Sequence, residues 1–156
     1  MYNCVIIIGP PCSGKSTIGK KLAELIHYKY ISSGDIAREL SQSQEMIDKL
    51  NNGEMFDEDT MRSEIKKILS NTDNVVLDGF PRFEDQLVWL MKQFTNANYT
   101  FVHVDASLTE IARRAIGRDR GDDKVLDKRM CYYIKNTKPI LDVISSNGYT
   151  ILEVEN

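Results

Sequence analysis

The chain of 156 residues has little of what marks disulfide-stapled or membrane-spanning proteins. It contains only 3 cysteines, Cys4, Cys12 and Cys131, which form no C-x-x-C pair and have no histidine cluster nearby. A disulfide framework or a structural zinc site is therefore not expected, and reduced thiols indicate a cytosolic protein. The first apolar run, residues 4–8, is too short for a secretion signal or a membrane span. We expect a soluble, cytoplasmic protein with no membrane partner.

The chain also lacks an excess of charge of one sign. Its 20 basic and 23 acidic residues give a net charge of −3, so no bulk positive field draws it to nucleic acid. With 4 prolines, 9 glycines and 42% hydrophobic residues, the composition argues against a disordered, collagen-like or repeat protein. We expect one domain spanning residues 1–156 and, in solution, a monomer.

Short β-branched segments alternate with longer segments of helical periodicity. Residues 5–8 are continuously apolar, which is typical of a strand buried on both faces. The pattern predicts five strands, at residues 5–8, 30–32, 74–77, 100–104 and 149–154, and helices at 18–26, 36–40, 44–70 in two pieces, 87–94, 108–116 and 125–144. Such alternation predicts a three-layer α/β/α fold with a parallel five-stranded sheet, and ligands at the carboxyl ends of its strands.

Residues 9–17, Gly-Pro-Pro-Cys-Ser-Gly-Lys-Ser-Thr, satisfy the phosphate-loop pattern G-x-x-x-x-G-K-[ST]. The glycines let backbone N–H groups converge on phosphate oxygens, and the helix that follows directs its positive dipole end at them. Lys15 supplies a mobile positive charge for the β- and γ-phosphates, and the Ser16 hydroxyl can bind Mg²⁺. We therefore expect a nucleoside triphosphate site formed by Cys12, Ser13, Gly14, Lys15, Ser16 and Thr17.

Three further segments resemble the nucleoside monophosphate kinases, adenylate kinase most closely. They are Ser33-Gly34-Asp35-Ile36-Ala37-Arg38, Asp78-Gly79-Phe80-Pro81-Arg82 with Gln86, and an arginine-rich stretch within residues 114–139. The resemblance runs from about residue 5 to residue 154, and the N-K-x-D motif of GTPases is missing. It implies a P-loop kinase with an acceptor-binding segment at about residues 33–70 and a minimal lid at about residues 118–123.

The resemblance also implies roles for individual residues. Phosphoryl transfer brings two phosphates into line, and guanidinium groups suit this because they bind phosphate bidentately and stay charged. The catalytic residues would be Lys15, Arg82, Arg118, Arg120 and Arg129. Arg114 would lie against the ATP base, and Arg118 would contact the ATP phosphates. The acceptor AMP would be held by Ser33, Arg38, Phe56, Gly79, Arg82, Gln86, Arg120 and Arg129.

Asp78 and Gln86 predict two more specific features, a magnesium site and the recognition of the acceptor base. Asp78 closes an apolar strand, where an unpaired carboxylate is costly, so Mg²⁺ bound through water is its expected partner; the alternative is a carboxylate that caps the next turn. The Gln86 amide offers a donor and an acceptor that can pair with an adenine edge, whereas related pyrimidine kinases typically have Asn there. With these residues, the resemblance implies transfer of the γ-phosphoryl of MgATP to AMP, giving two ADP.

The lid departs most from the family pattern, because only Asp119 separates Arg118 from Arg120. No cysteine cluster is present there, which excludes a zinc-bearing lid. Two alternatives to an adenylate kinase stay open: a kinase for CMP, UMP or a deoxynucleotide, and a nucleotide-binding assembly factor with little turnover. The expected partners are small-molecule nucleotides, ATP with AMP and ADP.

Overall fold

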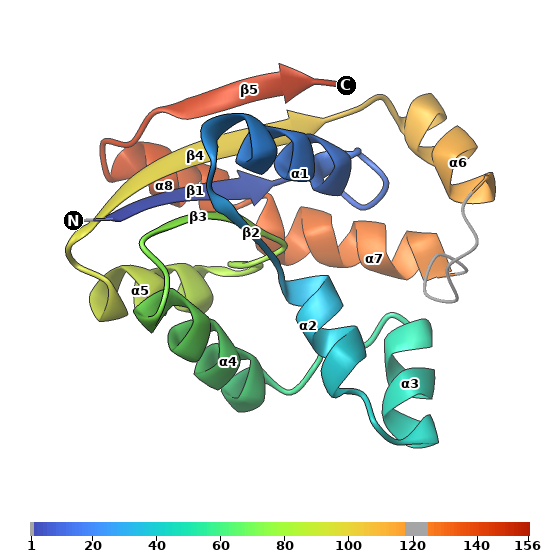
Figure 1. Cartoon of the computed structure of the whole chain (residues 1–156). Coiled ribbons are helices and arrows are strands. Elements are labelled where there is room, and N and C mark those ends of the chain that lie inside the picture. The colour runs from blue at the N-terminus through green and yellow to red at the C-terminus, as the bar shows by residue number, and fades with distance from the viewer. Residues whose placement is uncertain (1, 118–124) are drawn as a thin grey trace.

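A five-stranded parallel sheet forms the centre of the molecule (Figure 1). The computed structural model describes residues 2–117 and 125–156. The strands are β1 (Tyr2–Ile8), β2 (Lys29–Ser32), β3 (Asn74–Asp78), β4 (Ala97–Asp105) and β5 (Ile151–Glu155). They lie in the order β2-β3-β1-β4-β5, and every neighbouring pair is parallel. The predicted fold class is confirmed.

Both faces of the sheet are covered by helices, so its central strands are apolar throughout. Alternate side chains of β1, Cys4, Ile6 and Ile8, pack with the helices α4 (Glu58–Ser70), α5 (Glu84–Gln93) and α8 (Ile140–Ser146). The side chains between them, Val5 and Ile7, pack with α1 (Lys15–Ile26) on the opposite face. Because strand side chains alternate between faces, one continuous apolar run serves both cores.

Four other helices lie at the carboxyl ends of the strands. They are α2 (Ser33–Leu40), α3 (Gln44–Asn51), α6 (Leu108–Ile116) and α7 (Leu126–Tyr132). In Figure 1 the strand arrows point toward the side where these helices and the start of α1 gather. A small core of Cys12, Ala106 and Ile111 packs α6 against the phosphate loop. The parallel sheet thus brings the loops after β1, β2, β3 and β4 to one edge.

Two element boundaries differ from the sequence prediction. Helix α2 begins at Ser33 rather than at Ile36, because Ser32 is its N-cap and its Oγ accepts a hydrogen bond from the Asp35 N–H at 3.2 Å. The single helix predicted over residues 125–144 consists of α7, a π-helical turn η2 (Tyr133–Thr137) and α8. Pro139 precedes α8, and its missing N–H prevents an unbroken helix through this point.

None of the helices formed by residues 2–117 and 125–156 combines the length and the apolar character that crossing a bilayer requires. The break predicted at Asn51-Asn52-Gly53 separates α3 from α4, as expected. The minimal lid predicted at about residues 118–123 lies outside the described residues.

Candidate active site

The phosphate loop connects β1 to α1 in the tight turn that its sequence predicts. Gly14 is the N-cap of α1 and has a left-handed φ of 89°, which glycine adopts without Cβ strain. Gly9 passes so close to the Val104 carbonyl oxygen that a Cβ would not fit. Beside this turn, Lys15 Nζ donates a hydrogen bond to the Pro10 carbonyl at 3.0 Å. The N–H groups at the start of α1 and the lysine together form an anion-binding corner.

Asp78 ends β3 beside this loop and is almost fully buried. Its Oδ2 accepts hydrogen bonds from the Ser16 hydroxyl and from the Tyr30 hydroxyl, each at 2.6 Å. Burial, and next the negative charge of Asp78, raise the pKa of Tyr30 above its usual range. The phenol therefore stays protonated at neutral pH and remains a donor to the carboxylate.

The surroundings of Asp78 fit a magnesium ion bound together with a nucleotide. Its Oδ1 is buried and has no hydrogen-bond partner within residues 2–117 and 125–156. One hydroxyl and one carboxylate suffice for Mg²⁺, because this ion keeps several waters and takes phosphate oxygens as ligands. Across the same described residues, no group of three or more acidic, histidine or cysteine side chains could hold a metal by itself.

Arg82 is fixed by contacts from several directions. Its Nε donates to the Gly79 carbonyl at 2.8 Å, and its backbone N–H donates to Gln86 Oε1 at 2.7 Å. The Thr137 hydroxyl donates to the Arg82 carbonyl at 2.7 Å. Its Nη2 reaches the Ser33 hydroxyl at 3.5 Å. Elements far apart in sequence thus hold both the backbone and the guanidinium of Arg82 in place.

The charge around Arg82 favours an anion. Burial, and next the positive charge of Arg129, lower the pKa of the Arg82 guanidinium below its usual range, and Arg38 adds a smaller effect in the same direction. The group nevertheless stays protonated, because the pKa of arginine lies far above neutrality. Arg38 pairs with Asp35 at 2.6 Å. A bound phosphate would offset the repulsion between these cations.

One cavity of about 450 Å³ joins the phosphate loop to this arginine cluster. Most of the predicted site residues line it: Cys12, Lys15, Ser16, Ser33, Arg38, Phe56, Asp78, Gly79, Arg82, Gln86 and Arg129. It extends over α2, α3 and the segment before α4, and its far wall is α7 with η2. A ligand in this space would touch the phosphate loop and the arginine cluster at once.

Four predicted residues, Ser13, Gly14, Thr17 and Arg114, do not line the cavity. The guanidinium of Arg114 instead donates to the Ser13 carbonyl at 2.9 Å and pairs with Glu110 at 2.7 Å. Its predicted place against the ATP base stays a prediction. Arg118 and Arg120, to which phosphate contacts were assigned, lie outside the described residues.

Sequence reasoning missed Tyr30 and the role of Thr137. Tyr30 was predicted only as a residue of β2, and its contact with Asp78 depends on β2 pairing with β3, which places Ser32 beside Asp78. Sequence order alone does not reveal that pairing. Thr137 lies in the stretch of residues 114–139 that resembles the family, but its hydrogen bond to Arg82 spans 55 residues and is visible only in the fold.

A phosphate loop between a parallel strand and a helix, with an aspartate at the end of the adjacent strand, defines a P-loop nucleotide-binding protein. The comparisons with known proteins agree. A family model described as "AAA domain" matches residues 8–129. The adenylate kinase of Encephalitozoon cuniculi is 28% identical over 152 residues, which cover 94% of this chain and 86% of that protein.

Two further relatives have a higher sequence identity with this chain. The UMP-CMP kinase 2 of Caenorhabditis elegans is 31% identical, over 95% of this chain and 85% of its own length. The adenylate kinase of a Cyanothece species is 32% identical, over 88% of this chain and 80% of its own length. The chain belongs to the nucleoside monophosphate kinase family, and it is a phosphotransferase.

Proposed function

We propose that the protein transfers the γ-phosphoryl group of MgATP to AMP and releases two ADP. The observation that carries this proposal is the single cavity lined by Lys15 and Ser16 on one side and by Arg38, Arg82 and Arg129 on the other. Phosphoryl transfer requires little more than bringing two phosphates into line and stabilising their charge. A phosphate loop facing an arginine cluster across one shared space meets both requirements.

On the donor side, the loop residues Cys12, Ser13, Gly14 and Thr17 shape the turn that receives the ATP phosphates. Lys15 leaves the Pro10 carbonyl and neutralises charge on the β- and γ-phosphates. Ser16 and Asp78 would hold Mg²⁺, Asp78 through water, and the bound ion would supply further charge neutralisation at the phosphates. Arg114 and Arg118 complete the donor side by resemblance to the family.

On the acceptor side, Arg38, Arg82 and Arg129 hold the AMP phosphate, with Arg120 added by resemblance. Ser33 and Gly79 support Arg82 directly, because the Ser33 hydroxyl donates to the Gly79 carbonyl at 2.7 Å and that same carbonyl accepts from Arg82. Phe56 lines the cavity beside the acceptor segment. Lys15, Arg82, Arg118, Arg120 and Arg129 are the catalytic residues of this proposal.

Gln86 supports AMP as the acceptor. Its side chain is buried in the cavity wall, and its Oε1 accepts the Arg82 N–H. A carbonyl oxygen has two lone pairs, so the amide can still accept one hydrogen bond from an adenine edge and donate another. The alternative is a pyrimidine acceptor, which the 31% identity to a UMP-CMP kinase favours.

The deciding experiment compares kcat/KM for AMP, CMP and UMP at fixed MgATP, in the wild type and in Gln86→Ala. We expect AMP to be preferred, with Gln86→Ala narrowing the preference by about 1–3 kcal/mol. Loss of the contact to Arg82 affects all three acceptors alike, so the ratio of kcat/KM values isolates base recognition. Gln93→Ala, an exposed site at the end of the same helix, is the control.

A better rate with CMP or UMP would overturn the AMP assignment in favour of a pyrimidine acceptor. Absence of ADP formation with every acceptor would favour the nucleotide-binding assembly factor instead.

A further inference from the structure

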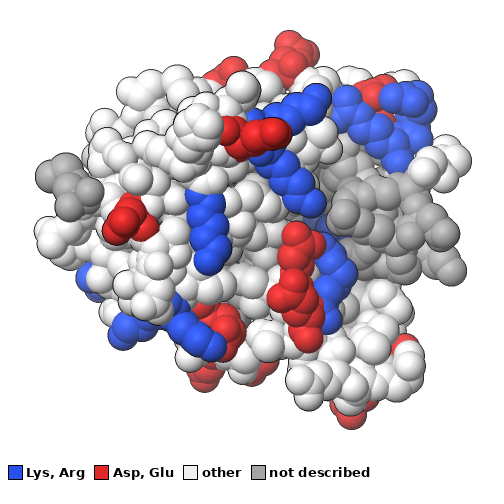
Figure 2. Space-filling view, viewed as in Figure 1, with Lys and Arg blue, Asp and Glu red and all other residues white. Residues whose placement is uncertain are grey.

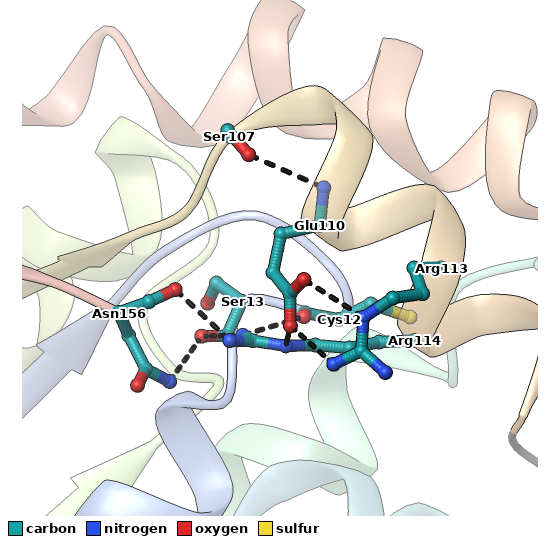
Figure 3. A network of polar contacts seen from close by, with 7 residues as sticks. All are labelled: Cys12, Ser13, Ser107, Glu110, Arg113, Arg114 and Asn156. Carbon is teal, nitrogen blue, oxygen red and sulfur yellow. Dashed lines mark hydrogen bonds and ion pairs between the residues drawn. The ribbon is translucent and has the colours of Figure 1, made fainter.

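Two side chains hydrogen-bond to the phosphate loop from outside the cavity, and a third holds one of them in place (Figure 3). They are Glu110 and Arg114 on α6 and Asn156, which follows β5, and we call them the loop clasp. Nothing in the loop motif requires them, because the motif ends at Ser16 and these residues lie roughly a hundred or more positions further along the chain.

The clasp acts on backbone carbonyls of the loop. The Ser13 carbonyl accepts two hydrogen bonds, from Arg114 Nη1 and from Asn156 Nδ2, each at 2.9 Å. Arg114 Nη1 also reaches the Cys12 carbonyl at 3.4 Å. A guanidinium and a primary amide therefore meet on the single peptide group that joins Ser13 to Gly14, as Figure 3 shows from close by.

Each member of the clasp is itself anchored. Glu110 accepts from Arg114 Nε at 2.7 Å, and the backbone N–H of Asn156 donates to the Asp105 carbonyl at 2.8 Å. Arg114 Nη2 donates to the Asn156 carbonyl at 3.0 Å, which ties α6 to the residue after β5. Hydrogen bonds from Arg113, and next those from Arg114, lower the pKa of Glu110 to about 2, so its carboxylate is charged at neutral pH.

Because of peptide geometry, the hydrogen bonds to the Ser13 carbonyl also determine the direction of the Gly14 N–H on the anion-binding side of the loop. The C=O and N–H of a trans peptide point in opposite directions, so fixing the Ser13 carbonyl outward directs the Gly14 N–H inward. Gly14 has no side chain in the way, and a Cβ there would collide with Asn156 Nδ2. The space behind the loop is thus filled by the asparagine, and the peptide cannot rotate without breaking both hydrogen bonds.

We propose that Asn156 and Arg114, held in place by Glu110, are positioning residues that lock the Ser13–Gly14 peptide with its N–H toward the phosphates of the bound nucleotide. This rests on the proposed use of the loop as the ATP phosphate site. Asn156 and Glu110 are the informative positions to test, since Arg114 is also expected to contact the ATP base.

The test measures binding of ATP and of inorganic tripolyphosphate to the whole protein by calorimetry, in the wild type, Asn156→Ala and Glu110→Gln. Loss of one hydrogen bond to the loop should weaken both ligands by the same factor, about 3- to 10-fold, because both depend on the same loop N–H groups. Glu110→Gln keeps the size of the side chain and should weaken both ligands in the same direction, by less. KM for the acceptor should not change in either variant.

Asn147→Ala is the matched control. Its side-chain amide also donates to a backbone carbonyl, that of Val143 at 2.8 Å, but on the helix α8 away from the loop. It should bind both ligands as the wild type does. Because binding is measured without turnover, the clasp is tested even if the protein fails to phosphorylate AMP, and failure of one proposal leaves the other standing.

Three outcomes would overturn the proposal. Weaker ATP binding with unchanged tripolyphosphate binding would show that Asn156 contacts the base rather than orienting the loop. Tighter binding of ATP in Asn156→Ala would show that the clasp obstructs the nucleotide. Unchanged binding of both ligands, in Asn156→Ala and in Glu110→Gln, would show that the loop holds its shape without the clasp.

Discussion

At the scale of single residues, Lys15 must change its hydrogen-bond partner for the proposed reaction. Its Nζ donates to a carbonyl of its own loop, Pro10. A triphosphate offers stronger, charged acceptors, and the flexible stem of lysine allows the ammonium to move to them. Lys15→Met should lower kcat by about 10²–10³-fold, because charge that develops on the phosphates loses its partner. The thermal midpoint should be near that of the wild type, and a folded variant with normal turnover would contradict the assignment.

Asp78 makes a second prediction at the scale of single residues. Asp78→Asn should raise the Mg²⁺ concentration needed for half-maximal activity and lower kcat, because a neutral amide holds the hydrated ion less well. Tyr30→Phe is its matched control: it removes one hydrogen bond to Asp78 but leaves the carboxylate. That variant should lose about 1.5–3 kcal/mol of stability with an unchanged Mg²⁺ titration. An unchanged titration in Asp78→Asn would indicate that the carboxylate only caps the turn.

At the scale of elements, the connection between α3 and α4 contacts α7 at the cavity. The Lys128 ammonium donates to the Asn52 carbonyl at 2.9 Å. Gly53 has a left-handed φ of 71°, and a Cβ there would lie 2.8 Å from Val125 Cγ2 and 3.4 Å from Arg129 Cγ. This connection therefore packs against the helix that carries Arg129, and the packing is possible because Gly53 has no side chain.

Gly53→Ala should raise KM for the acceptor nucleotide, because the new methyl group pushes the connection between α3 and α4 away from α7, which carries Arg129. Gly148→Ala is its matched control, since that glycine has a similar φ of 83° but open space around its Cβ position. Both variants should lose about 1–2 kcal/mol of stability from the left-handed conformation. Only Gly53→Ala should change KM, and equal acceptor KM values in the two variants would show that the contact has no role in acceptor binding.

At the scale of elements, the sequence predicts most of the strands and helices but fewer of the contacts that form the site. Periodicity predicts the strands and helices, because burial on two faces of a parallel sheet leaves a strong apolar pattern, as in residues 5–8. The phosphate loop is local in sequence, so its motif identifies it. The contacts of Tyr30 with Asp78 and of Asn156 with Ser13 depend on which strands become neighbours. No local pattern encodes that order, and these contacts emerge only from the assembled sheet.

At the scale of the whole molecule, the charges nearly balance. Figure 2 shows both basic and acidic side chains on one face, in keeping with the net charge of −3. Arg38, Arg82 and Arg129 all line the cavity, so this part of the molecule gathers positive charge at one site. Such a cluster favours an anionic ligand.

Stability should fall at alkaline pH, because five tyrosines become harder to ionise on folding. Burial is the largest cause of a raised pKa for Tyr2, Tyr30, Tyr99, Tyr132 and Tyr133, and it brings the pKa of Tyr133 to about 12. A raised folded-state pKa contributes stability that is complete below the unfolded pKa, near 10, and is lost as pH rises through the folded value. Urea unfolding at pH 8, 10 and 11 should show this loss. Tyrosines that all ionise near pH 10 in the folded protein would contradict it.

The fate of the γ-phosphoryl group tests the central claim most directly. Kinases suppress hydrolysis by closing over both nucleotides. The lid predicted from the sequence at about residues 118–123 is minimal, because only Asp119 separates Arg118 from Arg120, so the test includes a measurement of hydrolysis. With ATP labelled in its γ-phosphoryl group, we predict that label passes to ADP when AMP is present. A slower leak of labelled phosphate should appear without AMP and shrink when an unreactive acceptor analogue displaces water. Label that reaches free phosphate but never ADP, with or without AMP, would contradict the account.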